Sequence, residues 1–347
     1  MRLNTCRKEH KTYFIAEMSA NHANDLSVAL KIVEAAKEAG ADCIKTQLYS
    51  ADTLTIDCDN SCFQISSGLW NGYTLYELYG QACMPWEWQA EIQKKCVEVG
   101  LDFLATAFDQ SSVDYLVELG VDAIKIASFE LVDIPLVTYA AKQGKTMILS
   151  CGMCTKDEIQ DALDACLAVG NDDVFLMKCS SEYPANIEHL HLNTIPDMIR
   201  SFGVPVGFSD HSLGSLAPIV ATNLGACAIE KHFCLNKEIK TADCSFSMTP
   251  SEFSAMVADV KRAESAKGDA FYGVSESEKE SIIFRRSLFA VKDIDIGESF
   301  TEENVRSIRP GTGLSPKFYY QLIGKKSIRR IKRGDPILAS DLSGDDV

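Results

Sequence analysis

The sequence lacks any long apolar run and is short of basic residues. No uninterrupted apolar stretch approaches the roughly 20 residues of a membrane-spanning helix, so no membrane segment is expected. The chain has 34 Lys and Arg against 49 Asp and Glu, which gives a formal net charge of -15. A field of that sign repels nucleic-acid phosphates and anionic membrane surfaces, so neither is an expected partner.

Paired metal-ligand motifs are also missing, although cysteine is frequent. The 13 cysteines lie mostly in apolar segments such as Gly225–Ile229, as small hydrophobic residues do in a reduced, cytoplasmic protein. Cys151 and Cys154 have the spacing of a redox motif, and Cys58 with Cys62 could join a metal site. Neither pair has a second Cys or His pair at partner spacing, so unpaired structural thiols are the favoured interpretation.

One pattern recurs along the chain: a helix-like segment ends at a Gly, and a short apolar run follows. Gly closes the last turn of a helix in the left-handed conformation, and the apolar run suits a parallel strand buried on both faces. Helices are expected between the runs, for example over residues 26–39 and 156–169. The pattern predicts eight strands: Tyr13–Ala16, Cys43–Thr46, Phe103–Ala105, Ala123–Ile126, Thr146–Leu149, Val174–Met177, Val206–Phe208 and Cys227–Ile229.

Eight alternating β and α units in about 250 residues predict an α/β fold of the TIM (β/α)8 barrel type. The absence of GxGxxG after the first strand disfavours a dinucleotide-binding sheet. We expect the barrel in residues 1–268, a polar linker in 269–286 and a small β-rich domain in 287–347. The aromatic-rich interval from Leu48 to Trp88 is too long for a plain βα unit and is predicted to be an insertion beside the site.

Polar side chains follow the predicted strands at the end where TIM barrels carry their active sites. Lys45, Lys125 and Lys178 should converge on one mouth and together hold a multiply charged anion. Hydroxyl groups would complete a phosphate and carboxylate pocket: Thr106, Ser128, Ser150 and Ser209. The other polar residues at these ends are Glu17, Gln47, Asp109, Glu130, Ser180, Ser181, Asp210, His211, Glu230 and His232.

Two of the six histidines, His211 and His232, close the last two predicted strands. With the acidic neighbours Asp210 and Glu230 they predict a divalent metal site. Two imidazoles without cysteine partners leave positions open for water and substrate oxygens. A second close pair lies in a long loop and is interpreted as structural or exposed: His189 and His191.

Six motifs, in order, resemble those of the N-acetylneuraminate synthase family. They are Phe14–Glu17 with Asn21-His22, Ile44–Gln47, Lys125–Glu130, Ser150–Met153, Ser209–His211 and Glu230–Phe233. The tail resembles that family's antifreeze-like (SAF) domain, including Arg309-Pro310-Gly311, so the likeness spans the whole chain. It implies an enzyme that condenses phosphoenolpyruvate with an N-acetylated sugar and releases phosphate.

The resemblance implies a role for each matching residue. Glu17 would be the base acting on water, and His211 with His232 would bind manganese, or else magnesium or cobalt. The residues that would hold phosphoenolpyruvate are Lys45, Gln47, Thr106, Lys125, Ser128, Ser150, Ser181 and Ser209. Those that would contact the sugar are Glu130, Tyr183 and Asp243. Thr241-Ala242-Asp243 departs from the Gly-Pro-Asp type of turn that is usual before the last of these.

Within the family, Tyr73–Tyr79, Pro85–Trp88 and Ser128–Glu130 resemble the pseudaminic acid synthases. The apolar Phe129 and the tryptophans of the second segment, Trp86 and Trp88, would suit a 2,4-diacetamido-2,4,6-trideoxy hexose, because such a sugar offers fewer hydroxyls to pair.

The resemblance further implies a domain-swapped homodimer, in which Arg309 in the tail of one chain completes the barrel site of the other. Three alternatives stay open. The chain could be an N-acetylneuraminate or legionaminate synthase that uses a mannose-configured sugar. It could be a barrel synthase or aldolase acting on a simpler sugar phosphate, which would need a second phosphate site. It could also be a non-catalytic carbohydrate- or ice-binding protein, which would leave the polar strand ends unused.

Overall fold

The computed structural model describes residues 3, 6, 11–68 and 70–342. The chain divides into two compact units, Met1–Gly268 and Asp269–Val347, and each is considered by itself. The outermost parts of the predicted barrel and C-terminal domain, residues 1–2, 4–5, 7–10 and 343–347, lie outside the described residues, as does residue 69 of the insertion.

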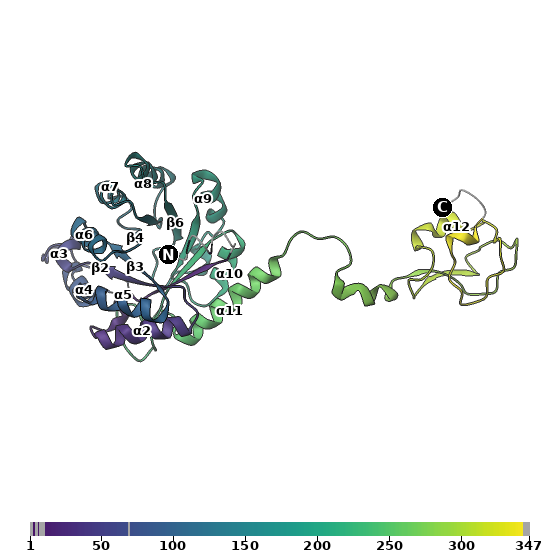
Figure 1. The fold of residues 1–347 in the computed structure, drawn as a ribbon, viewed down its shortest axis with the longest axis horizontal. Coiled ribbons are helices and arrows are strands. Elements are labelled where there is room, and N and C mark those ends of the chain that lie inside the picture. Colours follow the sequence, from purple (N-terminus) through teal and green to yellow (C-terminus); the bar gives the residue numbers. More distant parts are fainter. Residues whose placement is uncertain (1–2, 4–5, 7–10, 69, 343–347) are drawn as a thin grey trace. The chain divides into compact units, whose positions relative to one another are not determined.

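The first unit is a closed barrel of eight parallel strands in sequence order, surrounded by helices (Figure 1). The strands are β1 Tyr13–Glu17, β2 Cys43–Leu48, β3 Asp102–Ala107, β4 Ala123–Ile126, β5 Thr146–Ser150, β6 Val174–Cys179, β7 Val206–Asp210 and β8 Ala228–His232. Strand β1 closes the barrel, because it pairs with both β2 and β8; Glu17 is level with Lys45 on one side and with His232 on the other. The predicted TIM barrel is confirmed.

Side chains alternate along each strand between the barrel interior and the surrounding helices. The lower part of the interior is apolar and includes Tyr13, Ile15, Cys43, Leu104, Ile148, Phe175 and Met177. Positions further along the same faces are polar, beginning with Glu17, Lys45 and Thr106, and these side chains are also buried. The interior therefore has an apolar floor beneath a layer of buried polar groups.

Every strand except β4 continues past its predicted C-terminal end. Residues expected to follow the strands, among them Glu17 and Glu230, lie within them instead. Both carboxylates pair with Lys45 inside the barrel, so the strands need not end where the polar residues begin.

The helices around the barrel are α2 Leu26–Glu38, α5 Trp88–Val99, α6 Gln110–Glu118, α7 Ile134–Ala141, α8 Lys156–Ala168, α9 Thr194–Phe202, α10 Leu216–Asn223 and α11 Pro250–Lys267. The glycines that mark the predicted pattern all have positive φ, between 68° and 106°. Asp109 does not belong to the site, because its carboxylate caps α6 by accepting hydrogen bonds from the backbone N–H groups of Ser111 and Ser112.

The insertion between β2 and α5 contains two short helices, α3 Ala51–Leu54 and α4 Leu75–Ala82. Two of its tryptophans pack as structural groups. Trp86 stacks edge-on against Tyr115 with ring centroids 5.5 Å apart, and Trp88 does so against His22 at 5.8 Å. Both also pack against the barrel core, and their fit to the sugar stays a prediction. Short 3-10 helices elsewhere in this unit are η1 Ser19–His22 and η2 Ile187–His189.

The second unit is a small domain with one antiparallel pair of strands. Its elements are η3 Glu276–Phe284, β9 Ser287–Ala290, β10 Val305–Ile308, η4 Pro316–Phe318, α12 Tyr319–Leu322 and η5 Ala339–Asp341. Leu288, Phe300 and Ile331 belong to its own apolar core. The fully buried Asp341 binds the guanidinium of Arg329 through both oxygens, at 2.6 and 3.0 Å, which fixes the end of the described chain.

No helix in the described part of the chain has the length and apolar character needed to cross a membrane. In the described part of the chain no disulfide joins any of the 13 cysteines, Cys151 and Cys154 included, and seven of the 13 are buried. Cys62 is exposed and Cys58 half-buried.

Candidate active site

The barrel mouth contains a pocket of about 60 Å³, here called the mouth pocket. Strands β2 to β8 supply its walls, together with the loops that follow β3, β4, β6 and β7. Ten predicted site residues line it: Lys45, Gln47, Thr106, Lys125, Ser128, Ser150, Tyr183, Ser209, His211 and His232. Phe129, which was predicted to suit the sugar, and Glu230, which was predicted as an acidic neighbour of the histidines, also line it. The remaining lining residues, Phe108, Ala127 and Cys179, were not assigned a site role from the sequence.

Glu230 is the centre of a buried charge network. Its Oε2 lies 2.9 Å from Lys125 Nζ, and its Oε1 lies 3.4 Å from Lys45 Nζ. Ser209 Oγ donates to the same Oε1 at 3.0 Å. Lys45 Nζ also lies 2.8 Å from Oε2 of Glu17, so two ammonium groups face two carboxylates. Without a ligand, the two ammonium groups and the two carboxylates at the mouth balance in charge.

The two carboxylates of this network differ in proton affinity. Burial raises the pKa of Glu17, and the opposing effect of Lys45 does not cancel it. Burial acts on Glu230 in the same sense, but the Lys125 and Lys45 ammonium groups outweigh it and hold the pKa of that carboxyl well below its usual range. Environments that separate two carboxyl pKa values in this way divide their chemical roles. Of the two carboxyl groups, Glu17 has the higher affinity for a proton, whereas Glu230 favours the charged form that pairs with the lysines.

A hydrogen-bonded chain connects Glu17 with Asp243. Gln47 Nε2 donates to Glu17 Oε1 at 2.8 Å and to Ser19 Oγ at 3.1 Å, and Ser19 Oγ donates to Asp243 Oδ2 at 2.5 Å. Asp243 is buried, and burial raises its pKa. The unusual turn before Asp243 therefore still brings this carboxyl to the site. Sequence reasoning missed Ser19, which has no signal beyond its place just after β1.

Hydroxyl groups and a backbone amide meet at Gly152. The Gly152 N–H donates to Ser128 Oγ at 3.0 Å. A Cβ at position 152 would lie 2.9 Å from Ser128 Oγ and would come still closer to Ser181 Oγ, so only glycine fits. Ser181 does not line the mouth pocket, but it packs behind Ser128 at this point. Such a cluster of donors suits an oxyanion.

His211 and His232 face each other with ring centroids 5.3 Å apart. His211 Nδ1–H donates to the Ser180 carbonyl at 2.8 Å, which leaves its Nε2 free to act as a ligand. His232 Nδ1 is buried with no hydrogen-bond partner among the described residues. Burial, and then the neighbouring His211, lower the pKa of His232 well below its usual value, which keeps the imidazole in the neutral form that binds metals.

The donor set fits a divalent ion that keeps open positions. The two imidazoles face each other, and a ligand at the unpaired nitrogen of His232 would remove the cost of leaving it buried and unbonded. Across residues 11–68 and 70–342, no three His, Cys, Asp or Glu side chains form a closed metal cluster. Water or substrate oxygens would complete the coordination, as at catalytic ions.

Two predicted neighbours of the site point away from it. Lys178 shares the helix-facing side of β6 with Leu176, and its ammonium donates to the Cys179 carbonyl at 2.8 Å. The prediction that three lysines converge is therefore wrong for Lys178. Asp210 also faces outward and pairs with Lys231 at 2.8 Å, so it is not an acidic partner of the histidines. Glu230 binds the lysines instead.

Aromatic rings border the histidines. The Tyr183 ring lies 4.2 Å from that of His211 and 5.4 Å from that of Phe246, which in turn lies 5.0 Å from His232. Phe246 was missed, since it lies in the irregular loop after β8. Trp70 of the insertion lies 5.9 Å from Tyr183.

Glu130 lies outside the mouth-pocket lining. Burial raises its pKa to about 7, and its Oε2 is buried without a hydrogen-bond partner in the described chain.

Arg309 lies in the second unit, after β10. It is exposed, and its guanidinium lies 6.0 Å from the centre of the Phe284 ring. It forms no ion pair with any residue that the structure describes. The loop histidines are exposed as expected, and His189 lies 3.4 Å from Glu182.

Sequence comparisons match both units. The profile of the NeuB family matches residues 32–272, and that of the SAF domain matches residues 285–343. The chain is 44% identical to a pseudaminic acid synthase from Campylobacter jejuni, over 98% of this chain and 99% of that protein. It is 33% identical to an N,N'-diacetyllegionaminic acid synthase from Legionella pneumophila, over 94% of this chain and 93% of that one.

A solved structure has the same fold over nearly the whole chain. The spore coat polysaccharide biosynthesis protein SpsE from Bacillus subtilis superposes with a TM-score of 0.64 and 32% identity, over 96% of each chain.

Proposed function

This chain belongs to the NeuB family, and from that membership and the site we propose that it condenses phosphoenolpyruvate with a 2,4-diacetamido-2,4,6-trideoxy hexose to give pseudaminic acid and phosphate. The observation that carries the proposal is the buried set of Glu17, Lys45, Glu230 and Lys125 beside two facing histidines. The 44% identity to a pseudaminic acid synthase over almost the full length supports this branch over the legionaminic one, where identity is 33%.

Phosphoenolpyruvate is assigned to the mouth pocket. Lys45 and Lys125 are the only ammonium groups among the described lining residues, and they suit a phosphate and a carboxylate. Thr106, Ser150 and Ser209 supply hydroxyl groups around them, and Ser128 and Ser181 supply two further hydroxyl groups near Gly152, whose N–H holds the Ser128 Oγ in place. Gln47 orients Glu17 beside the substrate.

Glu17 acts as the base in this assignment. When C3 of phosphoenolpyruvate bonds to the aldehyde carbon of the open-chain sugar, C2 becomes electron-poor. Water then adds to C2 while Glu17 takes its proton, and the tetrahedral intermediate loses phosphate by C–O cleavage. A carboxyl whose pKa is raised by burial accepts a proton more readily than an ordinary Glu.

His211 and His232 would hold a divalent ion, for which we propose Mn²⁺, with Mg²⁺ or Co²⁺ as substitutes. Such an ion, when bound, polarises a carbonyl oxygen. The histidines belong to the sugar side of the site, because Tyr183 packs on His211 and Asp243 Oδ2 lies 3.9 Å from His232 Nδ1. Glu130, Tyr183 and Asp243 are the proposed sugar contacts.

We further propose that the chain works in the cytoplasm as a domain-swapped homodimer, in which Arg309 completes the site of the partner. An exposed guanidinium with no carboxylate partner among the described residues is available for such a contact. A charged hydrogen bond from it to the sugar would contribute about 1.5 to 3 kcal/mol.

The test incubates the purified chain with Mn²⁺, phosphoenolpyruvate and a panel of sugars while released phosphate is measured. Phosphate release should require both substrates, and the diacetamido sugar should react faster than N-acetylmannosamine. Mass spectrometry should find the nine-carbon acid. Faster reaction with a mannose-configured sugar would assign the chain to the neuraminate or legionaminate branch. Reaction only with a sugar phosphate, or none at all, would contradict the proposal.

A further inference from the structure

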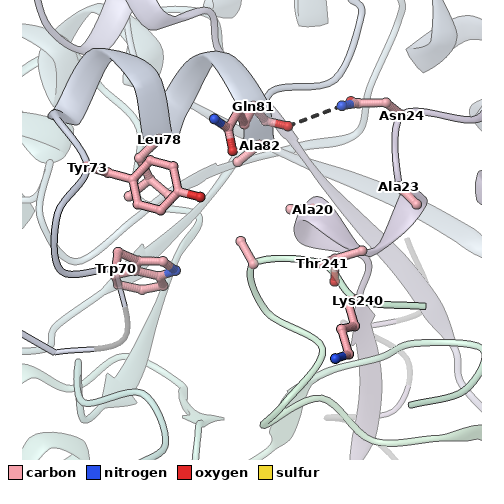
Figure 2. A pocket seen from close by; sticks show the side chains of 11 residues that line it. Ala20, Ala23, Asn24, Trp70, Tyr73, Leu78, Gln81, Ala82, Lys240 and Thr241 are labelled. Atoms are coloured by element: carbon pink, nitrogen blue, oxygen red, sulfur yellow. Dashed lines mark hydrogen bonds between the residues drawn. The ribbon is translucent and has the colours of Figure 1, made fainter. Parts of the chain in front are cut away.

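A second and larger pocket, here called the side pocket, has a volume of about 510 Å³. Three segments that are far apart in the sequence surround it: the insertion through α4, the chain around η1, and the loop after β8. Figure 2 shows the rings of Trp70 and Tyr73 on one side of the space and Thr241 and Lys240 on the other. None of these segments supplies the walls of the mouth pocket.

Two contacts join the side pocket to the sugar side of the active site. Trp70 lines the side pocket and lies 5.9 Å from Tyr183, whose ring lies 4.2 Å from His211. On the opposite wall, Ala20 and Thr241 adjoin Asp243: the Ala20 N–H donates to Asp243 Oδ2 at 3.4 Å, and Thr241 is two residues away in the chain. The side pocket therefore adjoins the sugar side of the active site at Tyr183 and at Asp243.

The lining is partly apolar and partly polar. Trp70, Leu78 and Ala82 form an apolar wall. Asn24, Gln81, Lys240 and Thr241 supply polar groups elsewhere in the lining. Thr241 Oγ1 donates to Asn21 Oδ1 at 2.6 Å, so this hydroxyl is occupied. No Asp or Glu occurs among the described lining residues. The side pocket therefore offers an apolar surface on the Trp70 side.

One donor on this wall remains unused. The indole Nε1 of Trp70 is buried and has no hydrogen-bond partner in the described chain. In Figure 2 this nitrogen lies on the edge of the ring that faces Thr241 and Lys240. A buried donor left unpaired is costly, so a carbonyl oxygen at this wall would be bound favourably.

We propose that the side pocket binds the distal half of the sugar and selects for its second acetamido group, with Trp70 as the specificity-determining residue. The proposal rests on the function proposed above. An acetamido group has a methyl group for the Trp70 and Leu78 surfaces and a carbonyl oxygen for the Trp70 N–H. A hydroxyl at the same carbon has no methyl and cannot reach either.

The dimensions agree with this assignment. An extended six-carbon chain is about 6 Å long from its C–C bond lengths, and an acetamido substituent adds to that reach. The two ring separations through Tyr183, 4.2 and 5.9 Å, set the upper limit on the distance from His211 to Trp70. The reach of a sugar with an acetamido substituent is thus of the same order as the separation between the histidines and Trp70.

The experiment compares two sugars of the same configuration, the 2,4-diacetamido-2,4,6-trideoxy hexose and an analogue with a hydroxyl at C4. Trp70→Phe keeps a ring and removes the N–H, and it should raise KM for the diacetamido sugar about tenfold. KM for the analogue, KM for phosphoenolpyruvate and kcat should stay within about twofold of wild type. Trp86→Phe is the matched control, because Trp86 packs on Tyr115 away from the pocket; it should leave the ratio of the two KM values unchanged.

A second variant tests the volume of the pocket. Ala82→Leu narrows the side pocket from α4 and should also weaken the diacetamido sugar selectively. Equal losses with both sugars, or none with either variant, would overturn the proposal while leaving the synthase function intact. If instead the wild-type enzyme turns over the analogue and not the diacetamido sugar, both proposals are wrong.

Discussion

The mouth pocket and the side pocket differ in what builds them. Seven strands supply the mouth pocket, which has about 60 Å³ and four paired charges at its base. Loops and α4 supply the side pocket, which has about 510 Å³ and none of these paired charges. Barrel register fixes side chains on strands, whereas loops can change without disturbing the barrel. By the proposals above, residues on the strands carry out the condensation and residues on the loops determine which sugar is accepted.

Removal of the divalent ion should have the largest effect on turnover, because the ion is proposed to act in the mouth pocket and not in the side pocket. Chelation should reduce turnover below detection with every sugar, and Mn²⁺ should restore it. The His211→Ala, His232→Ala double variant should stay inactive when Mn²⁺ is added. Full activity of that variant in a phosphate-release assay would mean that the histidines do not hold the ion.

Loss of the base Glu17 should have the second largest effect on turnover, and that effect should be the same with every sugar. Glu17→Gln keeps the shape of the side chain but cannot accept a proton, so kcat should fall by about 10² to 10⁴. Calorimetry should find phosphoenolpyruvate binding retained. Glu118→Gln on the exposed face of α6 is the matched control and should behave as wild type. Turnover near wild type in Glu17→Gln would show that another group acts as the base.

Loss of Arg309 should be smaller and should affect the sugar more than phosphoenolpyruvate. Arg309→Ala should lower kcat/KM for the sugar by about 10 to 100-fold, the range expected for one charged hydrogen bond. Arg306→Ala, an exposed neighbour on β10, is the control. Subunit exchange then tests action in trans, because a mixed dimer of Arg309→Ala and Glu17→Gln chains has one intact site. No recovery of activity, although heterodimers form, would contradict the proposal.

The smallest predicted effect concerns pH. Burial raises the pKa of Glu130 to about 7, so below that pH the carboxyl is neutral and can donate a hydrogen bond to the sugar. KM for the sugar should rise a few-fold between pH 6 and pH 8 as Glu130 ionises. The amide of Glu130→Gln donates a hydrogen bond at any pH, so KM of this variant for the sugar should not change between pH 6 and pH 8. An identical pH profile in the variant would exclude Glu130 as the titrating group.

The barrel and most of its mouth could be predicted from the sequence, because helix capping requires the repeated Gly and burial of a parallel strand requires the apolar run that follows it. Whether a strand residue faces the barrel interior or the helices could not be predicted in every case. The strand β6 is apolar on both sides, so nothing in Val174–Met177 indicates whether Met177 or Lys178 points inward. Met177 fills the interior, and Lys178 consequently faces the helices.

Aromatic residues in the insertion posed a similar problem. Trp70, Trp86 and Trp88 have no periodic pattern that separates packing from binding, and only contacts between distant segments distinguish them. Glu230 was underestimated for a related reason. Its position two residues before His232 places it on the same inward face, but its pairing with Lys45 and Lys125 depends on barrel closure.

The contact between Lys45 and Glu17 connects binding of the first substrate to the basicity of Glu17. An anion that enters the mouth competes with Glu17 for the Lys45 ammonium, 2.8 Å away. Once that ammonium turns to the anion, the cation that lowers the pKa of Glu17 is lost, and only the hydrogen bond from Gln47 still opposes the effect of burial. Glu17, whose pKa is already raised in the empty enzyme, then becomes a stronger base when the first substrate arrives, so binding of that substrate prepares the proton acceptor for the step that follows.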